Sequence, residues 1–531
     1  MYSHIDDPRR WILTEALDEA AGRTPDAPWL SDAGGNSLSF GQARSFSLRA
    51  AGFYERLGVE RGERVGLFLF NGCAYAIAWL GLGYRAATAV ILNTELRANF
   101  LQHQLVNAQL KTIVVDAEVL PALVEVADRA PGLRTVVVVG DLPDGMAMPG
   151  HWSVHVWPDW QEQPDWSGPG PQAQDIASIM YTSGTSGPAK GVMMPHAHCA
   201  LYGIGTIRCL DLTQDDRYYI ALPFFHANGL LMQLGATLLA GCSSHTRRRF
   251  SASHWLGDIR EQQATVTNLL GATSAFVLAQ PPADHDRDHR LRATLNAPNV
   301  PAHDRQFRER FGIEEVLSAF GMTECNIPIW GRLGRSAPGA AGWVHEDHFE
   351  VCIADPATDL PVADGEMGEI LVRPKVPFGF MAGYFDAPEL TLDAWRNLWF
   401  HTGDAGTRDA DGLVTFIDRI RDTIRRRGHN ISASEIEEAV AQLDGVAEVA
   451  AYPVHSDLEG GEDEVMLAVV ARDGVSLDAA ALGRQAAERL PRFASPRYVR
   501  LVDGLPKTGT GKVQRAVLRK QGAQGAVDLQ A

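Results

Sequence analysis

The sequence has few cysteines and no excess of positive charge. Its 531 residues include six cysteines, which are widely scattered and form no Cys-x-x-Cys pair. Neither a disulfide framework nor a thiolate zinc site is therefore indicated. Lys and Arg number 48 against 65 Asp and Glu, for a formal net charge of −17, which argues against a nucleic acid or an anionic membrane as partner. An anionic ligand would need positive charge supplied locally.

The sequence also lacks an N-terminal secretory signal and a clear membrane span. Its first residues, MYSHIDDPRR, carry acidic side chains and no apolar core, so we expect a cytoplasmic protein. Residues 65–84 carry no charge and are long enough for a membrane helix. Asn71-Gly72 is a turn signal that divides this run into a strand and a helix, so no integral membrane segment is expected.

Apolar strands and helical patterns alternate around this turn. This order predicts βαβ units and buried parallel sheets, whose strands are continuous apolar runs. The predicted strands cover residues 65–70, 88–93 and 112–116, and the predicted helices cover residues 73–87 and 94–105.

A change of composition near residue 418 indicates a second domain. A basic run opens there, and an amphipathic helix and a smaller α+β pattern of about one hundred residues follow it. We predict an α/β fold with a large, multi-subdomain N-terminal domain over residues 1–418 and a small α+β C-terminal domain over residues 419–531.

The segment YTSGTSGPAKG, residues 181–191, has the composition of a phosphate-binding loop. Glycines let backbone N–H groups approach a phosphate, hydroxyls donate to its oxygens, and a lysine adds positive charge. The segment is not a Walker A loop, because Ala189 precedes and Gly191 follows the lysine. A flexible surface loop is the alternative. The predicted phosphate-binding residues are Thr182, Ser183, Gly184, Thr185, Ser186, Gly187 and Lys190.

Six motifs over nearly the whole chain resemble the adenylate-forming superfamily of acyl-CoA synthetases, peptide-synthetase adenylation domains and luciferases. They are YTSGTSGPAKG, FGMTE (320–324), GEILVRP (368–374), HTGDAG (401–406), DRIRDTIRRRGHNIS (418–432) and PKTGTGKVQR (506–515). The run RRRGHNIS is most similar to the carnitine/crotonobetaine-CoA ligase branch. The resemblance implies an AMP-forming acid–CoA ligase, which activates a carboxylic acid with ATP as acyl-AMP, releases pyrophosphate and then forms the CoA thioester.

The resemblance assigns the chemistry of the first step to three residues. Lys512, on a C-terminal domain that the resemblance implies is mobile, would bridge the acyl carboxylate and the adenylate. Glu324 would hold Mg²⁺ through hard oxygen ligation, and Thr323 would donate a hydrogen bond to the α-phosphate.

Other residues are implied to bind the nucleotide. Asp404 would accept both ribose hydroxyls, and Arg419 would add a charged donor. Phe320 stands where the family commonly has Tyr, which keeps a ring for adenine stacking and removes a hydroxyl. The family's glycine-rich adenine strand is altered at residues 296–301, and Arg421 occupies a hinge position that is usually Asp or Lys. The further nucleotide contacts implied are Asn296, Ala297 and Gly321.

The acid and CoA would meet near two further motifs. His226, in PFFHANG, falls where the family lines the mouth of the acid pocket, and Gly428 falls where it forms the thiol tunnel. The pocket candidates mix apolar bulk with few fixed charges, which favours a neutral, mid-sized or aromatic monocarboxylate. These candidates are His226, Asn228, Met232, Ala272, Phe320, Met322 and Trp330.

Two other functions stay open at this point. A stand-alone adenylating enzyme would pass the activated acid to an amine, a carrier protein or another non-CoA acceptor, or would act on an unusual oxyacid. A catalytically idle binding homologue is the third hypothesis. It is disfavoured because Glu324, Asp404 and Lys512 are all present. We expect ATP, Mg²⁺, CoA and a small-molecule carboxylic acid as ligands, and a homodimer is compatible with the sequence.

Overall fold

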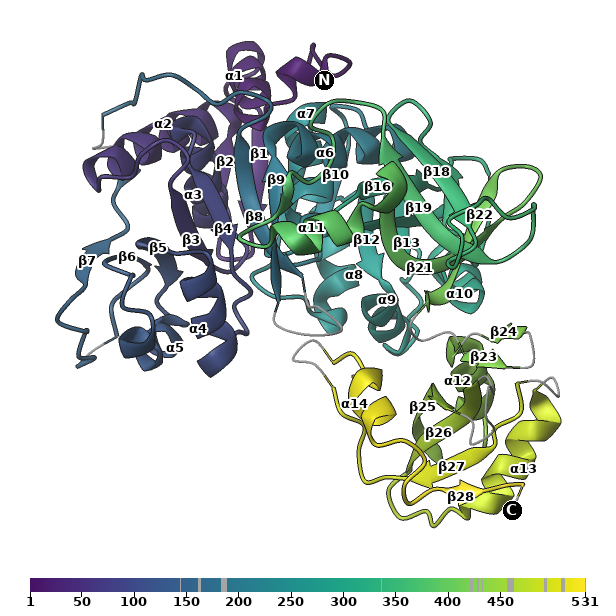
Figure 1. Ribbon diagram of the computed structural model, residues 1–531. Helices are drawn as coiled ribbons and strands as arrows, with labels where there is room; N and C mark the ends of the chain where they lie inside the picture. Colours follow the sequence, from purple (N-terminus) through teal and green to yellow (C-terminus); the bar gives the residue numbers. More distant parts are fainter. Residues whose placement is uncertain are drawn as a thin grey trace.

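The structure is a computed structural model that describes residues 1–143, 145–160, 164–182, 189–335, 337–420, 424–426, 429–431, 433–455, 463–490, 494–507 and 511–530. A large N-terminal body contains three sheets, and a smaller C-terminal body with a sheet of its own lies beneath it (Figure 1). The predicted α/β class with a large and a small domain is confirmed.

The sheet predicted from the alternating N-terminal pattern is present and has eight strands in the order β20-β9-β8-β4-β3-β5-β6-β7. β3 (Arg64–Phe68) lies parallel to its neighbours β4 (Thr88–Ile91) and β5 (Thr112–Asp116). α3 (Cys73–Arg85) and α4 (Ala98–Asn107) follow β3 and β4. The other strands are β6 (Thr135–Val139), β7 (Ser153–Val156), β8 (Ile176–Thr182), β9 (Lys190–Pro195) and β20 (Gly383–Tyr384).

The charge-free run at residues 65–84 is therefore divided between β3 and α3, as predicted. Both elements are buried, because the parallel strands are covered on both faces by helices. Among the residues that the structure describes, no helix is long and apolar enough to cross a bilayer.

A second sheet of seven strands has the order β14-β13-β12-β10-β11-β1-β2 and is parallel except at its β1–β2 edge. Its strands are β1 (Pro28–Asp32), β2 (Ser37–Ser39), β10 (Arg217–Ile220), β11 (Ser243–Thr246), β12 (Val266–Leu270), β13 (Ala293–Ala297) and β14 (Glu315–Leu317). The helices that connect them include the π-helical η4 (Asn228–Gly235), α7 (Ala236–Ala240), α8 (Ala252–Glu261), α9 (Gly271–Leu278) and α10 (Pro301–Phe311).

A third sheet is antiparallel throughout, with the order β15-β16-β17-β22-β21-β19-β18. The sequence pattern did not predict it, because its strands lack the long apolar runs of the parallel sheets. Its strands are β15 (Ala319–Met322), β16 (Asn326–Trp330), β17 (Gly342–Val344), β18 (Phe349–Ala354), β19 (Gly368–Pro374), β21 (Phe400–Arg408) and β22 (Leu413–Arg419).

One central helix, α6 (His196–Leu210), connects these layers. All its residues except Arg208 are buried, as expected for a helix that is apolar on every side. It contacts β8 and β9 of the first sheet, β16 of the third, and η4. The other elements of the large body are α1 (Leu13–Arg23), α2 (Phe40–Arg56), α5 (Leu120–Glu125), α11 (Pro388–Ala394), and the short helices at Pro8–Arg10, Ala127–Arg129 and Arg396–Leu398.

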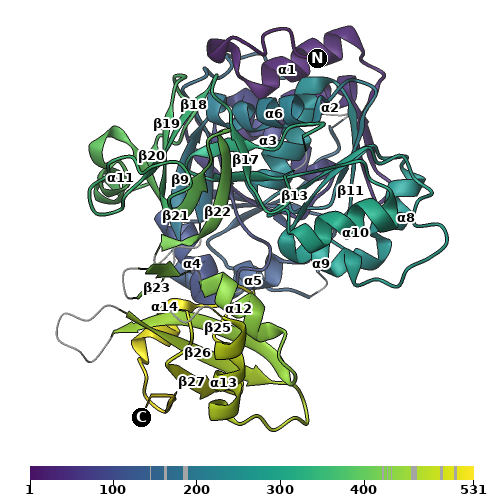
Figure 2. The same ribbon diagram turned by 90° about the vertical axis from the view of Figure 1, so that its right-hand side faces the viewer.

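The small C-terminal body is built on a four-stranded sheet with the order β25-β26-β27-β28. Figure 2 shows α12 and α13 packed on this sheet, and the body lying under the large one. Its elements are the β23 (Ile424–Arg426) and β24 (His429–Ile431) ribbon, α12 (Ala433–Ala441), β25 (Val446–His455), β26 (Asp463–Ala471), α13 (Ala479–Arg489), β27 (Tyr498–Leu501), α14 (Arg515–Lys520) and β28 (Val527–Asp528).

Candidate active site

A cleft of about 600 Å³ collects residues from both bodies and from several of the motifs. Its wall includes the ends of β8 and β9, the turn after β15, and β21, and the small body contributes Lys512 and Arg519. Its lining holds three carboxylates, Glu324, Glu369 and Asp393, and four cationic side chains, Lys190, Arg396, Lys512 and Arg519. Cations therefore outnumber carboxylates in the cleft, whereas the chain as a whole is strongly acidic. This is the local positive charge that an anionic ligand requires. The predicted site residues in the lining are Thr182, Lys190, His226, Gly321, Thr323, Glu324 and Lys512.

Glu324 is a buried carboxylate in the wall of this cleft. Only 5% of the residue is exposed, and the Tyr384 hydroxyl donates a hydrogen bond of 2.9 Å to its Oε1. Lys190 Nζ lies 4.9 Å from the centre of the same tyrosine ring, a cation–π distance. Tyr384 thus connects the lysine of the glycine-rich segment to Glu324, and sequence reasoning did not identify it.

The turn that carries Thr323 and Glu324 is held by α6. The Tyr202 hydroxyl donates 2.9 Å to the Met322 carbonyl, and His198 Nε2 lies 3.0 Å from the Thr323 carbonyl oxygen. Because the main-chain carbonyls are fixed from behind, the side chains of the turn face the cleft. Gly321 is required in this turn, since an added Cβ would lie 2.1 Å from the carbonyl oxygen of Asn326.

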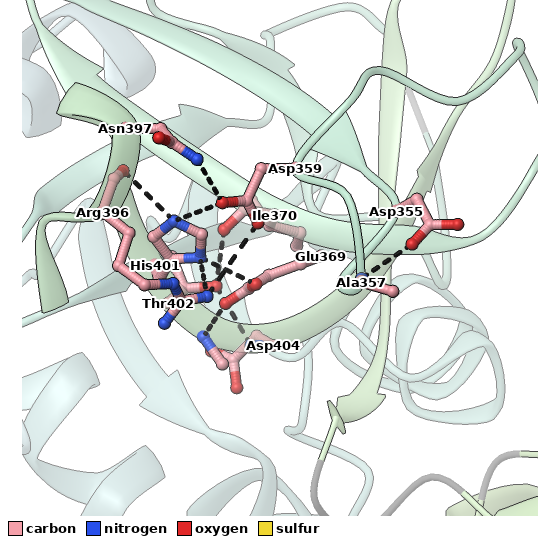
Figure 3. Close-up of polar contacts among 11 residues, drawn as sticks. Asp355, Ala357, Asp359, Glu369, Ile370, Arg396, Asn397, His401, Thr402 and Asp404 are labelled. Carbon is pink, nitrogen blue, oxygen red and sulfur yellow. Dashed lines mark hydrogen bonds and ion pairs between the residues drawn. The ribbon is translucent and has the colours of Figure 1, made fainter. Parts of the chain in front are cut away.

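Asp404 is fixed by contacts between β19 and β21, shown in Figure 3. The Thr402 hydroxyl donates to the Ile370 carbonyl at 2.7 Å and accepts from the Asp404 N–H at 3.0 Å. Glu369 Oε1 accepts from the Gly403 N–H at 2.9 Å. Asp404 is 3% exposed and does not line the cleft itself, but it lies directly after Thr402 and Gly403, which do.

His401 extends this network to the cleft's edge. Its Nδ1 lies 2.9 Å from Glu369 Oε2 and 2.9 Å from Arg396 Nη2. Its Nε2 lies 3.9 Å from Asp359 Oδ2 (Figure 3). The His401 ring, which is itself on β21 with Asp404, therefore connects this strand to the short helix that contains Arg396.

His226 faces Lys512 across the domain boundary. Desolvation by the surrounding protein, although His226 is partly exposed, and the Lys512 ammonium, which opposes a second positive charge, lower the pKa of His226 to about 4. The imidazole is therefore neutral at pH 7. The arrangement places Lys512 of the small body in the same cleft as His226.

The small body holds the Lys512 segment by a partly buried ion pair. Arg515 Nη2 lies 2.8 and 2.7 Å from the two carboxylate oxygens of Glu437 on α12, and Glu437 Oε1 also accepts from the Ala451 N–H at 2.8 Å. Charge-assisted pairs of this kind fix geometry strongly. Arg515, at the start of α14, is three residues after Lys512, so this ion pair anchors the segment that carries Lys512.

Several predicted site residues are not in the lining. Phe320 is packed in the core, where its ring stacks on Phe416 with the centroids 5.8 Å apart, and Asn296 and Ala297 lie at the end of β13. Arg419 lies opposite Asp404 in the β21–β22 pairing, and its side chain is outside the described part. Ser183, Gly184, Thr185, Ser186, Gly187, Arg421 and Gly428 also lie outside the described residues. The roles of all these residues stay predictions.

Comparison with known families agrees with this geometry. Residues 17–385 match the AMP-binding enzyme family, and residues 435–512 match the AMP-binding enzyme C-terminal domain. The chain therefore belongs to the AMP-binding enzyme family, and the predicted adenylate-forming superfamily is confirmed.

Relatives of known function are similar over almost the whole chain. A sulfoacetate–CoA ligase from Cupriavidus necator is 32% identical over 517 residues, 95% of this chain and 97% of that protein. A crotonobetaine/carnitine–CoA ligase from Escherichia coli is 26% identical, over 89% of this chain and 91% of that protein. The predicted similarity to the latter branch is thereby confirmed.

Solved structures show the same fold. The anthranilate CoA ligase AuaEII in complex with anthranoyl-AMP has a TM-score of 0.82 at 25% identity, over 96% of each chain. ATP-bound MatB from Rhodopseudomonas palustris has a TM-score of 0.81 at 26% identity, over 96% of this chain and 98% of that one. Together with the family, these likenesses confirm the predicted class of enzyme, an AMP-forming acid–CoA ligase.

Two buried histidines of α6 give an expected pH dependence of stability. Burial lowers the pKa of His196 and of His198 to about 4, while an unfolded chain binds these protons near pH 6.5. The stabilising effect of both neutral rings is therefore complete above pH 6.5 and is lost as the pH falls towards 4. We expect each ring to cost roughly 2 kcal/mol of folding free energy at pH 5, at about 1.4 kcal/mol per pKa unit.

Thermal unfolding at pH 7.5 and pH 5.0 measures this effect. The wild type should lose stability at pH 5.0, and His198→Gln, which keeps a donor for the Thr323 carbonyl, should lose less on acidification. An acid-induced loss of the same size in both proteins would exclude His198 as a source.

Proposed function

We propose that the protein uses this cleft to activate a small carboxylic acid with ATP and then to transfer the acyl group to CoA. The observation that supports this most directly is the gathering of Thr182 and Lys190, Thr323 and Glu324, and Lys512 around one cleft. These residues come from three separate motifs and two domains. Each has the side-chain chemistry that acyl-adenylate formation requires.

In the first step, a carboxylate oxygen of the acid attacks the α-phosphorus of ATP, and the bond from that phosphorus to the β-phosphate bridging oxygen breaks. The products are acyl-AMP and pyrophosphate. The Lys512 ammonium reduces the repulsion between the two anions, and Thr323 donates to the α-phosphate. In the second step the CoA sulfur attacks the acyl carbon, and AMP leaves with the oxygen that came from the acid.

The residues present fit a magnesium ion. The buried carboxylate of Glu324 offers hard oxygen ligands, and the hydrogen bond from the Tyr384 hydroxyl to Oε1 orients it. In the described part of the chain, no group of three or more His, Cys, Asp or Glu side chains could hold a metal ion. Mg²⁺ at nucleotide sites is usually bound by one or two carboxylates together with phosphate oxygens. When bound, Mg²⁺ would supply charge neutralisation at the phosphates.

The nucleotide would lie along the cleft between the glycine-rich segment and β21. Lys190 and the Thr182 hydroxyl would bind phosphate oxygens, and the Asp404 carboxylate would accept the ribose hydroxyls. Thr402 and Glu369 position the turn that carries Asp404. Arg419, which pairs with Asp404 along the strands, would add the charged donor.

We further propose that the domain boundary follows Asp418 and that the small domain rotates between the two steps. β22, the last strand of the third sheet, ends at Arg419, and Lys512 is already directed to the cleft, the arrangement that the first step needs. Gly428 would take the place of Lys512 for the second step.

A cytoplasmic location is supported by six free thiols, and the homodimer stays a prediction.

Pyrophosphate release tests the function. Purified protein with ATP, Mg²⁺ and a panel of carboxylic acids should release pyrophosphate with at least one acid, and added CoA should increase turnover and give an acyl-CoA. Release that is indifferent to CoA but increased by an amine or a carrier protein would favour the alternative acceptor. No release with any acid would contradict the proposal.

A further inference from the structure

The chain around His226 makes a turn over residues 222–228 that leads into η4. Asn71 holds it from the neighbouring sheet, because its Oδ1 accepts from the Phe224 N–H at 2.7 Å and its Nδ2 donates to the Leu222 carbonyl at 3.0 Å. Gly229 is required here, since an added Cβ would lie 2.3 Å from the Pro223 carbonyl oxygen. Asn228, which directly precedes Gly229, is therefore fixed in place.

Asn228 is the outer end of a buried chain of hydrogen bonds. Its Oδ1 accepts from Asn268 Nδ2 at 2.9 Å and from Gln233 Nε2 at 3.1 Å. Asn268 accepts in turn from the Tyr218 hydroxyl. Asn268 and Gln233 are both fully buried, and such groups are costly in a core unless they serve a purpose.

This network sets the orientation of the Asn228 amide. Both buried donors contact its oxygen, so its Nδ2 lies on the other side of the planar group. Asn228 is half-buried, and Nδ2 has no acceptor within the described part of the chain. Gln233 Oε1 is also buried without a donor there. Two polar atoms near the start of η4, Asn228 Nδ2 and Gln233 Oε1, therefore have no hydrogen-bond partner in the described part of the chain.

Asn228 does not line the cleft itself, but it follows a cleft residue closely in the chain. Asn228 is two residues after His226, which lines the cleft with Lys512 and Thr323. Asn268 lies on β12, in the parallel part of the second sheet, and ligands in such sheets bind beyond the carboxyl ends of the strands. An acid whose carboxylate lies beside Lys512 would direct its first carbons towards Asn228.

We propose, on the basis of the proposed function, that Asn228 selects the acid by donating a hydrogen bond from Nδ2 to an oxygen on it. The substrate class is a short carboxylic acid with a second oxygen-bearing group, such as a sulfonate, a second carboxylate, a carbonyl or a hydroxyl. A purely apolar acid would leave the oriented amide without an acceptor, and a site built around a hydrogen bond rejects an analogue that lacks it. This departs from the neutral or aromatic acid favoured by the sequence.

The test uses acids matched in length and differing at the far end. One set is propanoate, malonate and sulfoacetate, the other is butanoate, succinate and 4-aminobutanoate, and benzoate represents the aromatic class. We expect kcat/KM for pyrophosphate release to be at least tenfold higher for the best oxygen-bearing acid than for its apolar match. A preference for butanoate or benzoate would overturn the inference while leaving the proposed function intact.

Asn228→Asp and Asn228→Leu identify the residue responsible. Asp keeps an oxygen for both buried donors but presents an oxygen in place of Nδ2, so it should lower kcat/KM for oxygen-bearing acids at least tenfold and raise it for 4-aminobutanoate, with the KM for ATP unchanged. Leu should abolish the preference. Asn99→Asp, the same exchange on the exposed face of α4, is the matched control and should behave as wild type.

Two results would contradict the role of Asn228. One is an unchanged ratio between oxygen-bearing and apolar acids in Asn228→Asp, at a thermal midpoint close to wild type. The other is an equal loss for all acids, which a structural role would produce. If no acid yields pyrophosphate in the wild type, the proposed function fails, and the inference with it.

Discussion

Replacing Lys512 with alanine should abolish acyl-adenylate formation. The ammonium stabilises a transition state in which two anions meet, and loss of such a contact costs about 3 kcal/mol or more, roughly a hundredfold in rate. Lys512 lines the cleft and lies near enough to His226 to lower its pKa. The measurement is pyrophosphate release with a saturating acid, alongside thioester formation from preformed acyl-AMP and CoA, which should be much less affected.

Lys507→Ala is the matched control for this variant. Lys507 is in the same segment, but its Nζ pairs with Glu448 at 2.6 Å on the small body and does not line the cleft. It should retain both half-reactions. Pyrophosphate release near the wild-type rate in Lys512→Ala would exclude this lysine from the mechanism, and equal loss of both half-reactions would indicate a structural role.

Glu324→Gln should give the second large effect. An amide is a weaker ligand than a carboxylate for a hard cation, so the variant should need more Mg²⁺ for half-maximal pyrophosphate release and should lose about a hundredfold in rate at low Mg²⁺. The fold should be retained, because glutamine still accepts the hydrogen bond from the Tyr384 hydroxyl. The measurement is a Mg²⁺ titration of the initial rate.

Glu350→Gln is the control for Glu324→Gln, because Glu350 is a partly exposed carboxylate paired with Arg373 on the third sheet. It should show the wild-type Mg²⁺ dependence. An unchanged titration curve in Glu324→Gln would mean that the metal is held elsewhere.

The parallel part of the fold could be predicted from the sequence because buried parallel strands are recognisable as apolar runs. β3, β4 and β5 occur within a few residues of their predicted positions. The antiparallel third sheet could not be predicted in this way, since strands such as β15 and β17 are short, and β17 pairs with β22 through residues distant in the chain, Gly342 with Val414.

The same physical distinction applies to the site. Residues within motifs, such as Glu324 and Lys512, were found because the motif itself indicates chemistry. The residues that position them were missed because their partners are remote: His198 contacts Thr323 across 125 positions, and Tyr384 contacts Glu324 across 60. Glu369 and His401 lie within recognised motifs, GEILVRP and HTGDAG, but only the pairing of β19 with β21 brings them together.

Transfer of ¹⁸O from a labelled acid tests the central claim most directly. If a carboxylate oxygen attacks the α-phosphorus of ATP, complete turnover with CoA and a doubly ¹⁸O-labelled acid should leave one ¹⁸O in AMP and one in the acyl-CoA, as mass spectrometry would show. Formation of ADP, with the ¹⁸O in inorganic phosphate and none in AMP, would contradict acyl-adenylate formation.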